Sequence, residues 1–154
     1  MRTVTNYHYY EELNLTIGED GGKLSVIDWG RQIFAGTNQQ TPLTDETYRQ
    51  LCDYFAGRRK SFDLPLEVHG TEFEMAVWAE LQKIPYGKTT TYTQIAQDLG
   101  DKEARRAVGM ACNHNPIAIV IPCHRVIGAD GSLVGYVGTL DAKKALLRLE
   151  QNNS

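Results

Sequence analysis

The chain is organised around one stretch of ten residues, Ile119-Val120-Ile121-Pro122-Cys123-His124-Arg125-Val126-Ile127-Gly128. Apolar β-branched residues flank a Pro-Cys-His-Arg box on both sides, which predicts a buried strand or a pair of strands. Pro122 has no N–H to give to a sheet, so regular pairing should break there and leave Cys123 at the edge of buried structure. A cysteine in this position is either a structural core residue or a nucleophile. In an extended chain His124 points away from Cys123, so it would act on the thiol through a water or after a turn.

The motifs around this box resemble those of the O6-alkylguanine-DNA alkyltransferases, in order and in spacing. The box itself is similar to that family's active-site box, and it stands among further matching motifs: Tyr92, Arg106-Ala107-Val108-Gly109, Asn115-Pro116, Gly135-Tyr136-Val137-Gly138 and Leu147-Arg148-Leu149-Glu150. The resemblance is strong from Gly70 to Glu150 and weaker before Gly70. Some relatives share the scaffold but lack the cysteine and only bind lesions, so Cys123 places this chain with the repairing members.

The resemblance implies the activity of a methylated-DNA–[protein]-cysteine S-methyltransferase. Such a protein moves a methyl or other alkyl group from O6 of guanine, and from O4 of thymine, to Cys123, irreversibly and once per molecule. The target atom is inaccessible in a duplex, so the nucleotide must be flipped out. The implied partner is double-stranded DNA containing alkylated guanine, bound by a monomer without a cofactor. Two rivals remain: a lesion-binding protein of the same fold without transfer, and a Cys-His hydrolase that turns over repeatedly.

The resemblance also implies roles for individual residues. Cys123 would be the alkyl acceptor, Glu150 would hold His124 in a relay through water to the thiol, and Tyr92 would help to rotate the nucleotide and protonate guanine. Arg106 would enter the base stack where the damaged nucleotide leaves. The further DNA-binding residues would be Arg105, Ala104, Ala107, Tyr92 and Arg125. The guanine pocket would be formed by Asn115, Tyr136, Val137, Gly138 and Val126.

Composition gives little information about partners. The 154 residues carry a net charge of −3, and the deficit lies in the first half, with 7 basic and 10 acidic residues up to Val68. Between Lys102 and Ala129 there are four basic residues and one acidic residue, a local positive patch of the kind that phosphate contacts need. No apolar run reaches the roughly 18 residues of a membrane span, and the start has no signal-peptide core. Three cysteines without paired spacing suit a reducing interior, so we expect a cytoplasmic protein, nuclear if the organism is a eukaryote.

Residues 1–68 predict a small α/β domain with a linker. Strands are expected at 7–10, 13–17 and 23–29, with a turn over 18–22, and alternation predicts that the second strand is half-buried. A helix capped by Thr44 should follow, with a core face of Tyr48, Leu51, Cys52 and Phe55, and Gly57 should end it. The family resemblance implies a ribonuclease H-like arrangement without a nuclease site. Some family members bind zinc in this region, but the four histidines and three cysteines make no ligand cluster, so no metal is expected.

Residues 69–154 predict a mainly helical domain for DNA binding and alkyl acceptance. A capping box at 71–74 opens one helix, Thr91 opens a second and Asp101 a third. The second and third are joined by a turn containing Gly100, which is typical of a helix-turn-helix and also of plain helical bundles; the resemblance implies a winged-helix-like domain. The third helix has the apolar stripe Ala104, Ala107, Val108 and Ala111. Small residues beside Arg105 and Arg106 suit entry into the narrow minor groove. A last helix at 141–150 should bury Ala142, Ala145, Leu146 and Leu149, followed by a frayed tail.

Overall fold

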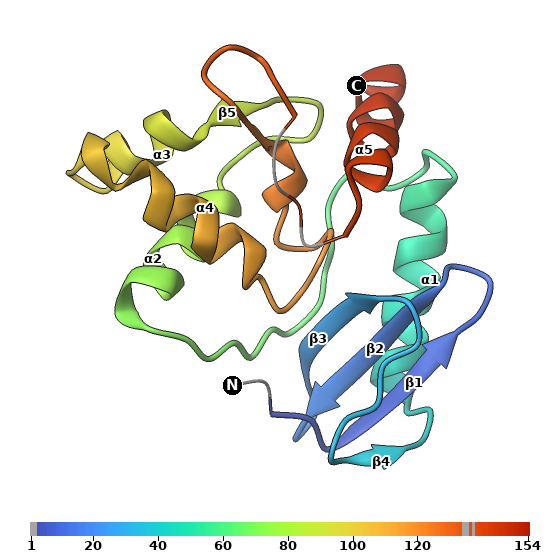
Figure 1. Ribbon diagram of the computed structural model, residues 1–154. Coiled ribbons are helices and arrows are strands. Elements are labelled where there is room, and N and C mark those ends of the chain that lie inside the picture. Colours follow the sequence, from blue (N-terminus) through green and yellow to red (C-terminus); the bar gives the residue numbers. More distant parts are fainter. Residues whose placement is uncertain (1–2, 134–135, 137) are drawn as a thin grey trace. The chain divides into compact units, whose positions relative to one another are not determined.

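The computed structural model describes residues 3–133, 136 and 138–154 (Figure 1). The chain folds into two compact units: Met1–His69 with Pro116–Ala118, and Gly70–Asn115 with Ile119–Ser154. The predicted domain boundary between residues 68 and 69 would place the short segment 116–118 in the second domain. In the structure this segment belongs to the first unit. The reason is a pair of backbone hydrogen bonds with Ile27, from its N–H to the Pro116 carbonyl (3.0 Å) and from the Ala118 N–H to its carbonyl (3.1 Å).

The first unit contains a four-stranded mixed sheet in the order β3-β2-β1-β4. Its strands are β1 (Asn6–Tyr10), β2 (Leu15–Asp20), β3 (Lys23–Trp29) and β4 (Thr37–Asn38). β2 is antiparallel to both β1 and β3, and β4 is parallel to β1. The turn between β2 and β3 is only Gly21-Gly22, with φ of 59° and 89°, a conformation that favours glycine. β2 therefore ends later than predicted, because residues 18–20 still pair with the neighbouring strands. It also begins later, at Leu15 and not at Leu13.

β2 is buried on both faces, which corrects the prediction of a half-buried strand. Every residue from Leu15 to Glu19 is buried, including the polar Thr16. The Thr16 hydroxyl donates to the Gly30 carbonyl (2.8 Å) and accepts the Gln32 N–H (2.9 Å). A threonine whose hydroxyl is hydrogen-bonded on both sides can be buried at little cost. Alternation alone missed this because the loop after β3 supplies the partners.

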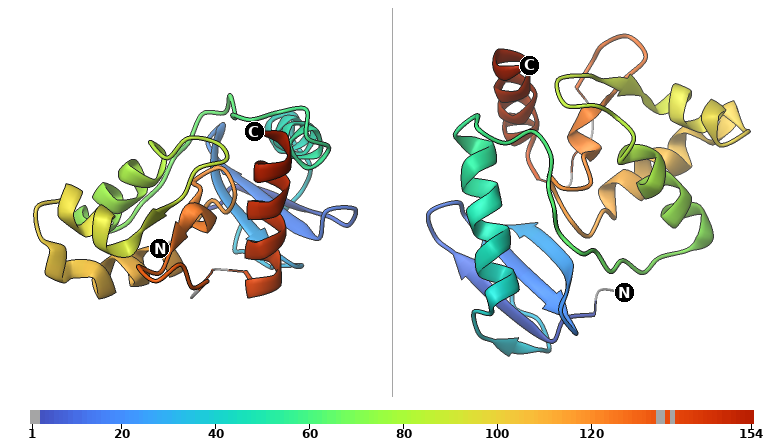
Figure 2. Two further views of the ribbon diagram at one scale, coloured as in Figure 1. Left: turned by 90° about the horizontal axis from the view of Figure 1, so that it is seen from above. Right: turned by 180° about the vertical axis from the view of Figure 1, so that it is seen from behind.

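Helix α1 (Pro42–Phe55) packs across one face of this sheet, as the view from behind in Figure 2 shows. The N-cap is Thr41, not Thr44 as predicted: the Thr41 side chain accepts the Thr44 N–H (3.2 Å), and the Thr44 hydroxyl accepts the Thr41 N–H (2.9 Å). Pro42 at the first helical position is consistent with this earlier start. The helix ends before Gly57, which has φ of 79° and was the predicted stop.

The buried face of α1 is also rotated from the predicted one. It consists of Thr44, Thr47, Gln50, Leu51 and Tyr54, whereas Tyr48, Cys52 and Phe55 are only partly buried. Polar positions can lie in the core because each has a partner. The Tyr10 hydroxyl donates to Thr44 Oγ1 (2.9 Å), and Thr47 Oγ1 donates to the Leu43 carbonyl (2.8 Å).

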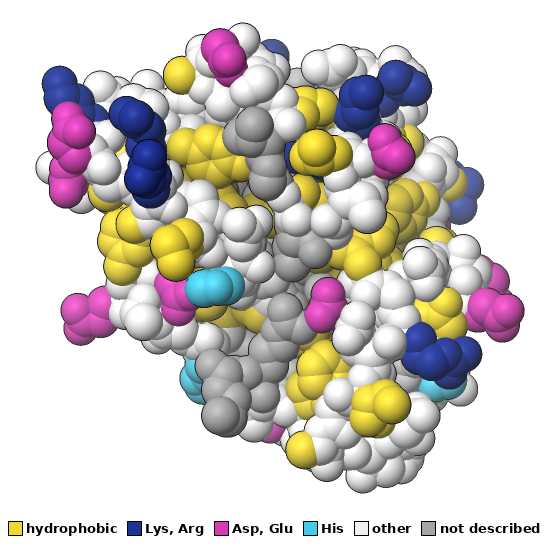
Figure 3. Space-filling model, in the orientation of Figure 1, with side chains coloured by type: hydrophobic (Ala, Val, Ile, Leu, Met, Phe, Trp, Pro, Cys, Tyr) yellow, Lys and Arg dark blue, Asp and Glu magenta, His cyan; other side chains and the backbone are white. Residues whose placement is uncertain are grey.

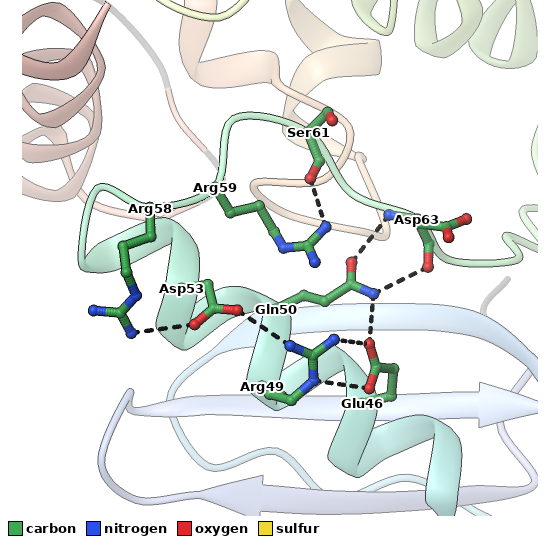
Figure 4. Close-up of polar contacts among 8 residues, drawn as sticks. All are labelled: Glu46, Arg49, Gln50, Asp53, Arg58, Arg59, Ser61 and Asp63. Atoms are coloured by element: carbon green, nitrogen blue, oxygen red, sulfur yellow. Dashed lines mark hydrogen bonds and ion pairs between the residues drawn. The ribbon is translucent and has the colours of Figure 1, made fainter.

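A polar network ties the segment after α1 back onto the helix (Figure 4). The buried Gln50 side chain donates to the Asp63 carbonyl (3.1 Å) and accepts the Asp63 N–H (3.0 Å). Arg49 bridges Glu46 and Asp53 on the exposed side of the helix. Exposed ion pairs of this kind contribute about 1 kcal/mol or less. The buried amide of Gln50 is therefore the main polar anchor of this segment.

The second unit is mainly helical. Its elements are α2 (Glu72–Leu81), β5 (Thr90–Thr91), α3 (Tyr92–Asp98), a 3-10 turn η1 (Lys102–Ala104), α4 (Arg105–Asn113), a second 3-10 turn η2 (Cys123–Arg125), β6 (Val126–Ile127) and α5 (Leu140–Asn153). β5 and β6 form a short parallel pair. The predicted capping box is present at the start of α2, where Thr71 and Glu74 exchange both hydrogen bonds. No helix in the described part of the chain is both long and apolar enough to cross a membrane.

α4 packs against α2 and α3, and the turn before it contains Gly100 with φ of 95°. Trp78 of α2 donates from its indole N–H to the Ala111 carbonyl (2.9 Å), which fixes the end of α4. The buried positions of α4 are Val108, Ala111 and Cys112. Ala107 is exposed and Ala104 only partly buried, so these two alanines do not belong to the inward stripe that their spacing predicted. Ala107 instead lies on the exposed face of α4 and Ala104 at its margin, where their small side chains project little from the helix.

α5 buries a different face from the one predicted. Lys143, Leu146 and Glu150 are its buried residues, whereas Ala145 is exposed and Leu149 only partly buried. The helix continues to Asn153, past the predicted end at residue 150. Two charged residues in a buried helical face require partners inside the unit, and both have them.

Candidate active site

Cys123 lies at the start of η2, directly after Pro122, and not on a strand. The predicted strand over residues 119–121 is absent: these residues form a turn in which the buried Ile119 has φ of 74°. Regular pairing begins only at Val126 in β6. The Cys123 N–H donates to the Ile121 carbonyl (2.8 Å), and the side chain is 2% exposed. The 3-10 turn, and not an extended chain, therefore sets where Cys123 and His124 point.

Asn115 supports the cysteine directly. Its amide nitrogen donates to the Ile121 carbonyl (2.8 Å) and to Cys123 Sγ (3.2 Å), so one buried side chain holds both the turn and the sulfur. Burial raises the pKa of the Cys123 thiol to about 11, while the Asn115 hydrogen bond and the charge of Lys143 act in the opposite direction. The sulfur is thus a thiol at neutral pH, and it needs a base before it can act as a nucleophile.

His124 and Glu150 form a buried pair. His124 Nε2 lies 2.7 Å from Glu150 Oε2, and the two side chains are 0% and 1% exposed. His124 Nδ1 is buried and has no hydrogen-bond partner among the described protein atoms. Burial lowers the pKa of His124, Glu150 raises it, and Arg125 and Lys143 lower it further. A neutral imidazole that donates from Nε2 to Glu150 leaves Nδ1 able to accept a proton.

Arg125 is not at a DNA-binding surface, and this corrects the role assigned to it from the sequence. It is 7% exposed, and its guanidinium donates from Nε to Glu150 Oε1 (2.8 Å) and from Nη2 to Glu150 Oε2 (3.0 Å). A third donor, Nη1, reaches the Ile84 carbonyl (2.7 Å). A guanidinium that is buried and held by three hydrogen bonds inside the unit is poorly placed to contact a phosphate.

Lys143 is a buried charge near the cysteine that sequence reasoning missed. Its Nζ donates to the Val126 carbonyl (2.6 Å) and lies 5.8 Å from the centre of the Tyr92 ring. Burial lowers the pKa of Lys143, and the neighbouring thiols Cys123 and Cys112 act against that shift. Burial also raises the pKa of Tyr92, which keeps its hydroxyl protonated at neutral pH. The spacing of Lys143 from Glu150, seven residues or two helical turns, could have placed it on the same face of α5.

An open cavity of about 760 Å³ lies beside α4 in the same unit. It is lined by Tyr92, Thr93, Arg105, Arg106, Gly109, Met110, Asn113, Gly128, Ala129 and Asp130. Arg105 and Arg106 are exposed, and so is Lys102 at the start of η1. In Figure 3 basic side chains, with acidic ones beside them, lie at the upper left, over the η1–α4 end of the unit. Tyr92 joins the two parts of the site, since it lines the cavity and the centre of its ring lies 5.8 Å from Nζ of the buried Lys143.

The cavity also includes residues that the sequence did not assign to a site, among them Met110, which is 61% exposed on α4. Of the predicted pocket residues, Val126 is fully buried and bonds Lys143 through its carbonyl, while Tyr136 and Gly138 are partly buried. Val137, like Gly135, lies outside the described residues. No group of three or more His, Cys, Asp or Glu residues with metal-ligand geometry occurs among the described residues.

Known proteins share both the sequence and the fold. A family profile described as "6-O-methylguanine DNA methyltransferase, DNA binding domain" matches residues 72–152. A methylated-DNA–protein-cysteine methyltransferase of Methanosarcina barkeri is 57% identical over 108 residues, which are 70% of this chain and 68% of that protein. One from Mycolicibacterium paratuberculosis is 56% identical over 105 residues, 68% of this chain and 64% of that protein.

The similarity to solved structures extends over both units. The crystal structure of Mycobacterium tuberculosis OGT in complex with DNA superposes with a TM-score of 0.90 at 40% identity, over 97% of this chain and 95% of that one. An O6-methylguanine DNA methyltransferase from Methanococcus jannaschii gives a TM-score of 0.70 at 30% identity, over 92% and 91%. With its cysteine box, its His–Glu pair and these similarities, the chain belongs to the 6-O-methylguanine DNA methyltransferase family.

Proposed function

We propose that this chain repairs alkylated DNA by transferring a methyl or other alkyl group from O6 of guanine, and from O4 of thymine, to Sγ of Cys123. The observation that carries the proposal is the buried Cys123 beside the His124–Glu150 pair, in a unit whose cavity is lined by Tyr92 and Arg106. The relatives named above are methylated-DNA–protein-cysteine methyltransferases, and one structural neighbour was solved with DNA.

The chemistry is a substitution at the alkyl carbon. His124 accepts the thiol proton at Nδ1 through a bridging water, and Glu150 holds the imidazole in the orientation that leaves Nδ1 open. The sulfur electron pair forms the S–C bond while the C–O6 bond breaks and its electrons pass to guanine. Tyr92 supplies a hydrogen bond or a proton to the leaving base, which its raised pKa allows at neutral pH. The product is a thioether, which has no good leaving group, so each molecule acts once and no cofactor is needed.

DNA recognition is assigned to α4. Arg105, Arg106 and Ala107 form its exposed side, with small Ala107 allowing close approach in the minor groove. The nucleotide is flipped at a cost of a few kcal/mol, and Arg106 occupies the gap and stacks on the neighbouring bases. Lys102 and Arg105 contribute phosphate contacts.

The finer assignments of architecture and setting belong to the same proposal. Residues 1–68 form a ribonuclease H-like domain with its linker, and residues 69–154 form the winged-helix-like, DNA-binding and alkyl-acceptor domain. The protein acts as a cytoplasmic monomer on duplex DNA. Lesion binding without transfer is the alternative for this fold, and Cys123 argues against it.

The direct test is to incubate the protein with a duplex containing O6-methylguanine and to analyse its peptides by mass spectrometry. We expect a mass gain of one methyl group on the peptide containing Cys123, whereas Cys123→Ser should bind the duplex and gain nothing. Cys112→Ser is the matched control, since it removes another buried thiol of the same unit. A methyl group on Cys52 or Cys112, with repair intact in Cys123→Ser, would refute the assignment of the acceptor. Binding without any methyl transfer by the unaltered protein would favour the lesion-binding alternative.

A further inference from the structure

The Glu150 carboxylate is shared by two side chains of η2. Arg125 binds both carboxylate oxygens, at 2.8 and 3.0 Å, and His124 binds Oε2 at 2.7 Å. The backbone N–H of Gly87 donates to Oε1 at 3.1 Å. Four donors thus converge on one carboxylate that is 1% exposed. This exceeds what orientation of a histidine requires, since a carboxylate can hold a ring with one hydrogen bond.

The guanidinium is itself fixed from the other side. Its Nη1 donates to the Ile84 carbonyl at 2.7 Å, and its central carbon lies 5.7 Å from the centre of the Tyr86 ring. Turn 84–87 therefore holds Arg125 through a carbonyl and a ring, and holds Glu150 through the Gly87 N–H. The arginine has one orientation available, flat against the carboxylate.

The charges around His124 oppose one another. Burial disfavours the imidazolium form most strongly; Glu150 of α5 favours it, and Arg125 of η2 and Lys143 of α5 add to the effect of burial. The remaining titratable groups nearby are Cys123 in η2 and Tyr86 in the turn before β5, and both are neutral at pH 7 because burial raises their pKa. The buried side chains of α2, which packs on η2, are apolar. A carboxylate alone would stabilise a charged histidine, but a carboxylate neutralised by arginine holds the ring without charging it.

We infer that Arg125 is a positioning residue for alkyl transfer, which holds Glu150 in place and opposes its charge, so that the buried His124 stays neutral and able to accept the thiol proton. This inference rests on the proposed function for its link to repair, but the protonation of His124 can be measured without any reaction. It replaces the DNA-contact role that the sequence suggested for Arg125. It also assigns a purpose to the Ile84–Gly87 turn, which holds both members of the ion pair.

The test compares variants that remove the positive charge of Arg125 or the negative charge of Glu150. Arg125→Met removes the positive charge with little change in side-chain length, Glu150→Gln removes the negative charge, and Arg125→Lys keeps the charge but loses the two-pronged geometry. The pKa of His124 is measured by NMR of isotope-labelled imidazoles in the unreacted protein, with His124→Gln used for assignment. The rate of alkyl transfer from an O6-benzylguanine duplex is followed against pH in parallel.

We expect Arg125→Met to raise the pKa of His124, or of the His124–Glu150 pair, by about one unit or more, and Glu150→Gln to lower it. The acid limb of the rate profile should move to higher pH in Arg125→Met, because neutral His124 is the active form. In Glu150→Gln it should move to lower pH. Arg125→Lys should lie close to the unaltered protein. If Arg125→Met does not fold, the double variant with Glu150→Gln removes the pair together, which buried pairs tolerate better than loss of one partner. In that variant the pKa of His124 should lie between the values of the two single variants, because both the raising effect of Glu150 and the lowering effect of Arg125 are removed.

Shifts in the same direction for both single variants, or none, would overturn the inference, as would a pKa of His124 in the double variant outside the range set by the two single variants. A salt dependence of duplex binding that falls by about one phosphate contact in Arg125→Met would also overturn it, in favour of DNA contact. If the NMR shifts appear but no variant or parent protein transfers an alkyl group, the proposed function fails and the charge relation between Arg125 and His124 stands.

Discussion

At the scale of single residues, the site depends on burying a nucleophile without making it inert. Complete burial raises the pKa of Cys123 to about 11, so at neutral pH almost all of it is thiol. The Asn115 hydrogen bond and the Lys143 charge oppose the effect of burial on this pKa, and the proposed base is His124. A buried thiol is also shielded from solvent oxidants and from adventitious alkylation, since reactivity follows thiolate character and exposure. The same burial that slows the resting thiol therefore protects it, which matters for a protein proposed to react only once.

The charge of Lys143 should make a measurable contribution to the pKa of Cys123. Replacing this lysine with methionine removes a cation that favours the thiolate, so the pKa of Cys123 should rise further. A nearby cation is worth about one to three pKa units, so the rate of reaction with free O6-benzylguanine should fall about tenfold or more. The rate is measured at several pH values on protein shown by circular dichroism to be folded.

The control for this prediction is Lys144→Met, which alters the exposed neighbour on α5. It should react at the rate of the unaltered protein. Equal rates for the two variants would show that the buried charge of Lys143 does not act on the sulfur.

At the scale of elements, α4 has separate faces for packing and for contact. Val108, Ala111 and Cys112 are buried against the unit, and Arg105 and Arg106 face outward into the cavity region. The Trp78 indole fixes the end of this helix through the Ala111 carbonyl. Changes on the exposed face should therefore affect DNA handling without affecting the fold.

Arg106→Ala should slow repair of a methylated duplex much more than reaction with free O6-benzylguanine. The free base needs no flipping, so only the duplex reaction loses the stacking of the guanidinium. That stacking is worth about 1–3 kcal/mol, which predicts a loss of about 5- to 150-fold on the duplex. Both rates are measured under single-turnover conditions.

Arg105→Ala is the matched comparison from the adjacent position. As a phosphate contact it should weaken duplex binding at all sequences and lower the salt slope by about one contact. Equal losses of Arg106→Ala on duplex and free base would contradict a role in flipping.

At the scale of the whole molecule, the reaction should leave a less stable protein. The new alkyl group must fit beside Ile121, Val126 and Asn115, which are all buried. Adding a methylene to a packed core typically costs about 1–3 kcal/mol. The alkylated sulfur also has no S–H and no negative charge, so it can neither donate a hydrogen bond nor attract Lys143 as a thiolate would.

The protein should therefore repair no more than one lesion per molecule and melt at a lower temperature after reaction. Titration of protein against methylated duplex gives the stoichiometry, and calorimetry before and after reaction gives the change in melting temperature. Mock-treated protein with unmethylated duplex is the control. Repair of more than one lesion per molecule would rule out single use, and an unchanged or higher melting temperature would rule out strain.

The sequence alone determined the features that depend on local chemistry. A glycine turn between β2 and β3, although shorter than the predicted 18–22, the capping box at Thr71 and Glu74, and the stop at Gly57 follow from backbone preferences of individual residues. The cysteine box identified the family and the acceptor candidate, because its motifs lie close together along the chain.

Tertiary structure decided which polar side chains are buried, and that could not be predicted locally. Burial of Lys143 and Arg125 is possible only because the Val126 carbonyl and the Glu150 carboxylate are brought to them by folding. A charged residue is expected to be exposed until its partner is known. The same reason explains the rotated face of α1 and the missing strand before Pro122, where distant hydrogen-bond partners outweigh the local apolar pattern.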